Sequence, residues 1–200
     1  QGAGSQGAYL TGATFDADLA TAGYQAVDAS MKIGSAGSRV NGNAVDLTNA
    51  LGALNFTALS IYNQNGNGIL ASGAGLALTS TAGTIDTLNG TTISLTGTQA
   101  DLVLANVVHA GTGTGVAISG LTGIGAGGRA LTVVNLQVTG GTNGISFTGN
   151  NNGNVSFGAA SSISGTSGAS IAIASGTGTL GFNYNGSVTQ SSNAALLGVR

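Results

Sequence analysis

The chain has 200 residues, of which 37 are Gly, 5% are charged and none is Pro, Cys or Trp, and its formal net charge is −2. A typical domain is about a quarter charged, so this surface must consist mainly of Ser, Thr, Asn, Gln and Gly. The composition excludes a disulfide scaffold or a thiolate metal site. It also gives no basic surface for nucleic acid, which we do not expect as a partner.

The apolar content does not indicate a membrane protein, although the mean hydropathy is +0.32. The best apolar runs, such as residues 102–108, are far shorter than the roughly 20 residues that a membrane-spanning helix needs. Much of the hydropathy comes from Ala, which is spread along the whole chain. We therefore expect no direct insertion into a membrane.

Residues 1–40 form the least regular part of the chain. The stretch 15–22 begins like a short helix, with Asp16 and Asp18 in its first turn, but it could equally be a first, imperfect coil. Terminal units of repeat proteins are typically more polar than internal ones. We therefore predict an N-terminal cap or irregular first coil over residues 1–40, followed by one repeat domain over residues 41–200.

Short apolar–polar–apolar segments recur from residue 41 onward, separated by Gly, Ser, Thr and Asn. Alternation with a period of two in such short pieces predicts strands. The region 102–118 superimposes on 131–147 with a constant step of 29 residues, which aligns Leu102 with Leu131, Leu104 with Val133, Asn106 with Asn135 and Val116 with Ile145. The coil is therefore slightly longer here, and we expect the Gly-rich stretch 121–129 to hold the extra residues.

Residues 131–200 repeat most clearly, in three series that share one period. Steps of 24 and 25 residues connect Leu131/Val133, Val155/Phe157 and Leu180/Phe182. Steps of 26 connect Ile145/Phe147, Ile171/Ile173 and Leu197/Val199, and steps of 25 connect Val138, Ile163 and Val188. Recurrence at a fixed period of roughly 20 to 50 residues is the mark of a solenoid.

These series predict an all-β fold, a right-handed parallel β-helix with three parallel sheets and coils of about 25–29 residues. Parallel crossovers are right-handed in nearly all proteins. Equivalent residues of successive coils should stack about 4.8 Å apart around one apolar column, with Phe157 under Phe182. The predicted stacking ladder comprises Leu102, Leu104, Val116, Leu131, Val133, Val138, Ile145, Phe147, Val155, Phe157, Ile163, Ile171, Ile173, Leu180, Phe182, Val188, Leu197 and Val199.

Asn106 and Asn135 fall at the same coil position, just after a strand, and form a candidate Asn ladder. Stacked Asn side chains can hydrogen-bond from coil to coil, and Asn also tolerates the left-handed backbone of a turn. The alternative is that Asn is simply common in this chain, in which case the alignment of the two residues carries no structural role.

Groups suited to catalysis are scarce. A glycosidase needs two carboxylates about 5–10 Å apart, but Asp86 and Asp101 are 15 residues apart, which is not a coil period. Asp101 and Arg129 are separated by nearly one coil length, so we expect them to form a surface ion pair that adds little stability. We predict no enzyme activity and no catalytic, cofactor or metal site. A polysaccharide lyase or hydrolase is the remaining enzymatic alternative.

His109 is the only histidine and falls one 29-residue step before Val138. Because no Ser, Cys or acid occupies an obvious matching position, we expect a structural role for it. Pairs of Thr separated by one residue also occur, and flat ranks of such pairs order water in β-helical ice-binding proteins. The pairs at 79/81, 96/98 and 112/114 do not share the coil period, so ice binding is a minor alternative.

The segments Gly144–Gly149 and Gly168–Ile173 resemble the β-helical repeats of large bacterial surface proteins, namely autotransporter passengers and related pectin-lyase-like adhesins. The resemblance covers residues 40–200 and is architectural, because no catalytic motif accompanies it. It implies secretion, an extracellular position at the bacterial cell surface, an elongated stalk, and adhesion or self-association. The implied partners are another copy, neighbouring domains of a longer chain, or a host or cell-surface glycan.

Three functions follow as expectations. A structural or adhesive stalk comes first, because the repeat fills the chain while catalytic groups are scarce. A glycan-binding or glycan-cleaving β-helix comes second, and clustering of Asp with Tyr or Arg in one groove would favour it. A head-to-tail filament subunit comes third, because the apolar stretch 195–200 lies in the middle of a coil by the repeat register. We expect either a continuing chain or another subunit to stack there.

Overall fold

The computed structural model of the protein describes residues 8–9, 30–174, 176–190 and 194–199. It is an all-β solenoid of about seven turns, in which 63% of the residues lie in strands. All pairings between its strands are parallel, which confirms the predicted parallel β-solenoid. The right-handed sense of the coil stays a prediction.

Each coil contributes strands to three faces. The first face is an eight-stranded sheet of β1 (Ala8–Tyr9), β4 (Val45–Leu47), β7 (Ile69–Ser72), β10 (Ile93–Thr96), β12 (Thr114–Ser119), β15 (Asn143–Thr148), β18 (Ile171–Ile173) and β21 (Leu197–Val199). The second face contains β5 (Gly52–Phe56), β8 (Leu76–Ser80), the first parts of β11 (Gln99–Gly111) and β14 (Arg129–Gly140), β16 (Gly153–Phe157), β19 (Leu180–Tyr184) and the short β13 (Thr122–Gly123).

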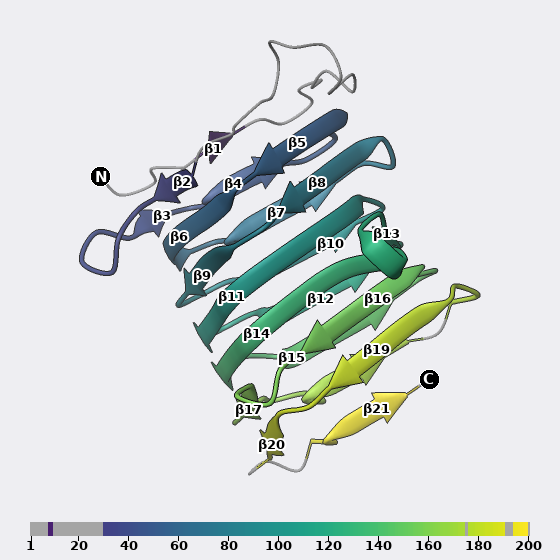
Figure 1. Ribbon diagram of the computed structural model, residues 1–200. Helices are drawn as coiled ribbons and strands as arrows, with labels where there is room; N and C mark the ends of the chain where they lie inside the picture. Colours follow the sequence, from purple (N-terminus) through teal and green to yellow (C-terminus); the bar gives the residue numbers. More distant parts are fainter. Residues whose placement is uncertain (1–7, 10–29, 175, 191–193, 200) are drawn as a thin grey trace.

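The third face contains β2 (Ser30–Ile33), β3 (Val40–Asn41), β6 (Ala58–Asn65), β9 (Gly83–Thr87), the last parts of β11 and β14, β17 (Ser162–Ser164) and β20 (Ser187–Thr189). The coils lie side by side in sequence order, from β2 at one end to β20 and β21 at the other (Figure 1). The described part of the protein is therefore a straight stack, in which each coil touches mainly the coils before and after it.

The second and third faces form one continuous sheet of 13 strands, whereas the three strand signals predicted separate sheets. β11 and β14 run through both faces without a break. At the bend of each strand two consecutive residues face outward, Ala105 and Asn106 in β11, and Val134 and Asn135 in β14. An extra outward residue bends a strand without ending it. The sequence marks the change of face, but it does not show that pairing continues through the bend.

Coil length varies along the solenoid. Ile69 pairs with Ile93, 24 residues on, so the early coils are shorter than expected. Val116 pairs with Ile145, 29 residues on, and the additional residues lie between β13 and β14, in the Gly-rich stretch that was expected to hold them. This stretch includes η1, a 3₁₀ turn over Ala126–Gly128. No helix in the described part of the chain is long and apolar enough to cross a membrane.

The predicted register of β19 is wrong by two residues. Val155 pairs with Phe182 and Phe157 with Tyr184, so Phe182 does not lie under Phe157. A shift of two residues keeps every side chain on the same face of a strand, so the alternation of apolar and polar residues cannot reveal it. The rings of Phe157 and Phe182 still meet diagonally, with centroids 6.3 Å apart.

The end of the segment 1–40 takes part in the stack. Residues 30–33 pair in register with residues 58–61, as an irregular first coil would. The helix-like stretch 15–22 lies outside the described residues, so the nature of the segment as a whole stays a prediction.

Glycine residues stack at the corner between the third and first faces. Gly42, Gly66, Gly90, Gly113 and Gly141 all have positive φ angles, between 82° and 143°. A Cβ atom on Gly66 would lie 2.8 Å from the carbonyl oxygen of Gly42, and one on Gly90 would overlap the carbonyl oxygen of Gly66. We call these five residues the glycine column. Only glycine fits both the backbone angle and the close approach of the next coil.

Replacing Gly90 with Ala should lower the free energy of unfolding by about 3 kcal/mol or more, because the new methyl group meets the backbone of the preceding coil. Gly97→Ala is the matched control. Gly97 also has a positive φ, of 62°, but a Cβ atom there would meet nothing within 4 Å. The Gly97→Ala substitution should lower the free energy of unfolding by only about 1 kcal/mol. Urea unfolding followed by circular dichroism measures both, and equal losses would contradict the stacking explanation.

Candidate functional site

The predicted stacking ladder lies inside the solenoid over most of its length. Its buried members are Leu102, Leu104, Val116, Leu131, Val133, Val138, Ile145, Phe147, Val155, Phe157, Ile163 and Ile171. Its partly buried members, packed against this core, are Ile173, Leu180, Phe182 and Val188. The 29-residue step brings Leu102 onto Leu131 and Leu104 onto Val133, as aligned from the sequence.

The last two members of the ladder differ from the others. Leu197 pairs with Ile171 and Val199 with Ile173, so the register continues. Their side chains are nevertheless 56% and 66% exposed, because β21 is the last strand of its sheet in the described part of the chain. An apolar sheet edge is a ready template for pairing with another strand.

The two residues of the candidate Asn ladder lie in contact. Asn135 pairs with Asn106, and its amide Nδ2 donates to Asn106 Oδ1 at 3.1 Å. Gln137 extends the ladder, because its Nε2 donates to Asn135 Oδ1 at 2.6 Å and its Oε1 accepts from Ser162 Oγ at 2.6 Å. The chain of hydrogen bonds therefore joins three successive coils on the outside of the third face.

Sequence reasoning missed two further Asn ladders beside the glycine column. Asn65 Nδ2 donates to Asn41 Oδ1 at 2.5 Å, and Asn89 Nδ2 donates to Asn65 Oδ1 at 3.2 Å. In the second ladder, Asn67 donates from both its backbone nitrogen and its Nδ2 to Asn43 Oδ1. The recurrence of Asn–Gly at 41, 65 and 89 was the signal available in the sequence.

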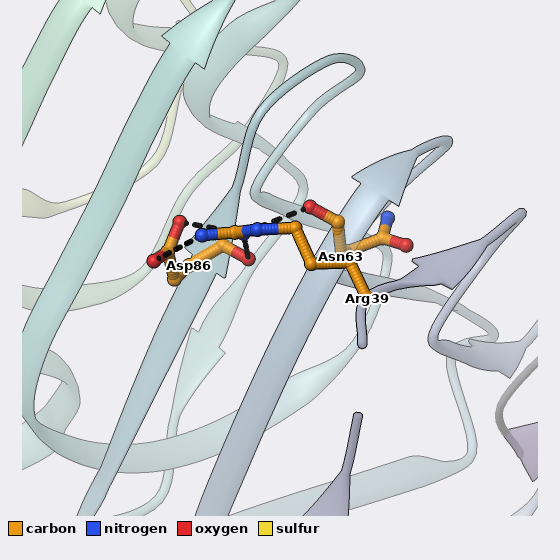
Figure 2. Close-up of polar contacts among 3 residues, drawn as sticks. All are labelled: Arg39, Asn63 and Asp86. Carbon is orange, nitrogen blue, oxygen red and sulfur yellow. Dashed lines mark hydrogen bonds and ion pairs between the residues drawn. The ribbon is translucent and has the colours of Figure 1, made fainter. Parts of the chain in front are cut away.

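Arg39 connects three coils at one end of the solenoid. Its Nη1 and Nη2 donate to the two carboxylate oxygens of Asp86 at 2.9 and 2.8 Å, and Nη1 also reaches the carbonyl oxygen of Asn63 (Figure 2). The guanidinium carbon lies 5.7 Å from the centre of the Tyr62 ring, within cation–π range. We call Arg39, Tyr62, Asn63 and Asp86 the arginine clamp. Arg39 and Asp86 are 47 residues apart, which is two coils, so the one-coil period of the sequence does not indicate their contact.

Asp101 and Arg129 form the ion pair expected from the sequence, with Nε to Oδ1 at 2.5 Å and Nη2 to Oδ2 at 2.9 Å. The hydrogen bonds that Arg129 donates to Asp101 and the negative charge of Asp101 both raise the pKa of Arg129. The side chains are 39% exposed for Arg129 and 20% for Asp101, so water weakens this pair more than the clamp.

The structure does not bring the carboxylates of Asp86 and Asp101 together. Asp86 lies on the third face and Asp101 on the second, and each is held by its own arginine. Among the described residues, no three His, Cys, Asp or Glu side chains gather in a way that could hold a metal ion. The polar side chains described above mainly form hydrogen bonds and ion pairs with residues of neighbouring coils.

His109 lies inside the solenoid, opposite Val138 as its spacing predicted, and is 1% exposed. Its Nδ1 lies 3.1 Å from the hydroxyl of Thr92. The coil period does not predict this partner, because Thr92 lies at the corner before β10, only 17 residues from His109. Burial away from water lowers the pKa of His109 to about 4. The imidazole is therefore neutral near pH 7.

No protein-family model, curated protein or solved structure matches this chain. The contacts within the solenoid are therefore the basis for any proposal about its function.

Arg39→Met should lower the free energy of unfolding by about 1–3 kcal/mol, because it leaves the carboxylate of Asp86, which is only 17% exposed, without its bidentate partner. Arg129→Met, which breaks the more exposed pair, should lower the free energy of unfolding much less than Arg39→Met does. Thermal and urea unfolding of both variants test this order. A loss at Arg129 as large as that at Arg39 would show that the three-coil clamp adds nothing.

The Asn106–Asn135 bond should appear as a coupling energy of about 0.5–1 kcal/mol in a double-mutant cycle of Asn106→Ala and Asn135→Ala. The control cycle combines Asn65→Ala with Asn135→Ala, because these two residues belong to different ladders and should show additive effects. Urea unfolding of the single and double variants gives both numbers. Additive effects in the first cycle would mean that the Asn ladder is only a compositional coincidence.

Proposed function

We propose that this chain is a structural and adhesive stalk segment of a secreted bacterial surface protein, acting through coil stacking and self-association. The observation that carries the proposal is the set of polar side-chain bonds between successive coils, on top of the backbone pairing. The clamp of Arg39 spans three coils, and so does the chain from Asn106 to Ser162. Bonds in this direction stiffen the stack along its axis.

A stalk has to be long relative to the number of residues that it contains. A solenoid meets this need because each coil adds a fixed length to the rod. About seven turns at ~4.8 Å each give a rod segment of ~34 Å. Each additional coil lengthens the rod without changing its cross-section. This regular growth is what a spacer between a cell surface and a distant binding domain requires.

The first face supports the self-association part of the proposal. No residue of β7, β10, β12, β15 or β18 is charged. The outward side chains include Ser94, Thr96, Ser119, Ser146 and Thr148, which line a shallow hollow of about 150 Å³. Surfaces without charge do little to keep copies of a protein apart. We expect copies to meet along this face.

Glycan binding is the second candidate, because the arginine clamp gathers Asp86, Tyr62 and Arg39 on one surface. Aspartate, tyrosine and arginine together offer acceptors, donors and an aromatic face. In this structure the arginine is already committed to the carboxylate, which favours the stabilising role. Loss of polysaccharide binding in Arg39→Met, with the fold retained, would support the glycan alternative.

A head-to-tail filament is the third candidate, because a coil of another copy could add to the stack by the same in-register pairing that joins β21 to β18. The filament and the stalk differ in one measurable property, which is whether the particles grow in length or in width as the concentration rises.

Electron microscopy of the purified chain over a concentration series tests the proposal. The stalk proposal expects rods of constant length that associate side by side as the concentration rises. Thr96→Lys with Thr148→Lys should abolish this association by placing charge on the first face. Thr139→Lys with Asn183→Lys, exposed residues of the other sheet, should leave it intact. Rods that lengthen in steps of one subunit would establish the filament instead, and single rods at all concentrations would refute self-association.

A further inference from the structure

One interior column of the third face changes from apolar to polar and back. Its members pair in register from coil to coil, so they stack inside the solenoid. They are Val40, Asn63, Thr87, His109, Val138, Ile163 and Val188. The three polar members lie in consecutive coils and are 0%, 0% and 1% exposed. Packing alone would favour aliphatic residues here, as in the other coils.

Each polar member of this column has an unused hydrogen-bonding atom. Asn63 Oδ1, Thr87 Oγ1 and His109 Nε2 are buried without a partner in the described part of the chain. The second polar atom of two of these side chains does have a partner. Asn63 Nδ2 donates to the carbonyl of Gly66, and His109 Nδ1 lies within hydrogen-bonding distance of the hydroxyl of Thr92. A buried polar atom without a partner costs about 1–3 kcal/mol. This stretch is therefore less stable locally than the apolar coils beside it.

Among the residues that the structure describes, no carboxylate faces the imidazole of His109 to balance a positive charge. Its neighbours are Thr87 on β9, Val138 on β14, Thr92 at the end of the turn before β10, and the backbone of Gly141. A Cβ atom on Gly141 would lie 2.8 Å from Nε2, so the backbone closes this side of the ring.

The charged groups on the surrounding strands lie on the outer side. Asp86 on β9 is held by Arg39, and Asp101 on β11 is held by Arg129 on β14. β8, β10, β12 and β13 contain no charged or titratable residue. A proton taken up by His109 would therefore create a buried charge with no described carboxylate to pair with it, which is strongly unfavourable.

We propose that Asn63, Thr87, Thr92 and His109 form an acid-sensitive joint, at which the solenoid opens locally between β9 and β14 when His109 takes up a proton. Opening admits water to the imidazole, which then becomes charged at no desolvation cost. The coils on either side keep their apolar columns and remain closed. The joint is a property of the fold and does not depend on the stalk proposal.

The direction of the pH effect follows from the two states of His109. Burial holds its pKa at about 4 in the closed coil, whereas a solvated His titrates near 6.5. The closed state is therefore fully favoured above about pH 6.5, and it loses stability as the pH falls toward 4. Between pH 7.5 and pH 5 the opening equilibrium should rise about 30-fold.

Hydrogen exchange measured by mass spectrometry at pH 7.5 and pH 5 tests this proposal on the complete chain. Both pH values lie above the range in which Asp side chains ordinarily titrate, near 3.9. After correction for intrinsic exchange rates, protection in β9, β11 and β14 should fall about 30-fold, while protection in β16 and β17 should change little. An equal fall in all strands, or no fall, would overturn the proposal.

Two variants separate titration of His109 from a general weakness of this region. His109→Val restores the aliphatic column, and His109→Gln keeps a neutral polar side chain of similar length. Both should remove the pH dependence in β9, β11 and β14. A fall of the same size in either folded variant would assign the acid response to other groups. A titration of the His109 ring by NMR, with its midpoint near 6.5, would also contradict the proposal.

Discussion

The distance between successive coils is the constraint on which the rest of the structure depends. Parallel strands approach to about 4.8 Å, and every residue of a coil has to accept a neighbour at that distance on each side. At the corner between the third and first faces this leaves no room for a side chain, and the glycine column results. On the outer faces the same spacing lets amides and hydroxyls of one coil reach those of the next.

This constraint also explains an unusual composition. A surface with so few charges would be poorly solvated in an ordinary domain, but here Asn, Ser, Thr and Gln satisfy one another along the axis. The ion pairs Arg39–Asp86 and Arg129–Asp101 follow the same rule, because each joins different coils. Glycine makes the unfolded chain costly to order, and the stacking of whole coils offsets that cost.

The sequence predicts what repeats on the inward side of the strands. Leu102 and Leu131 are recognisable because inward positions must be apolar in every coil, and alternation marks them. It does not predict the two-residue shift at Phe182, because both registers bury the same kind of residue. Nor does it show that two faces share one sheet, since that depends on backbone pairing at the bends of β11 and β14.

Some contacts of the candidate site can be predicted from the sequence and others cannot. Asn106 and Asn135 are separated by one coil length and have the same residue type, so their contact is visible in advance. Arg39 and Asp86 are two coils apart and of different type, and only the reach of a long side chain over Tyr62 joins them. The orphan atoms around His109 depend on which atoms turn toward the interior, a detail that no periodicity contains.

The loop between β13 and β14 has a practical consequence for engineering. It adds residues to one coil while the strands before and after it keep their pairing, as Leu102 does with Leu131. A peptide grafted into this loop would project from the side of the rod at a fixed height along the axis. Similar grafts on successive coils would make the solenoid a scaffold that presents foreign epitopes at regular intervals along its axis.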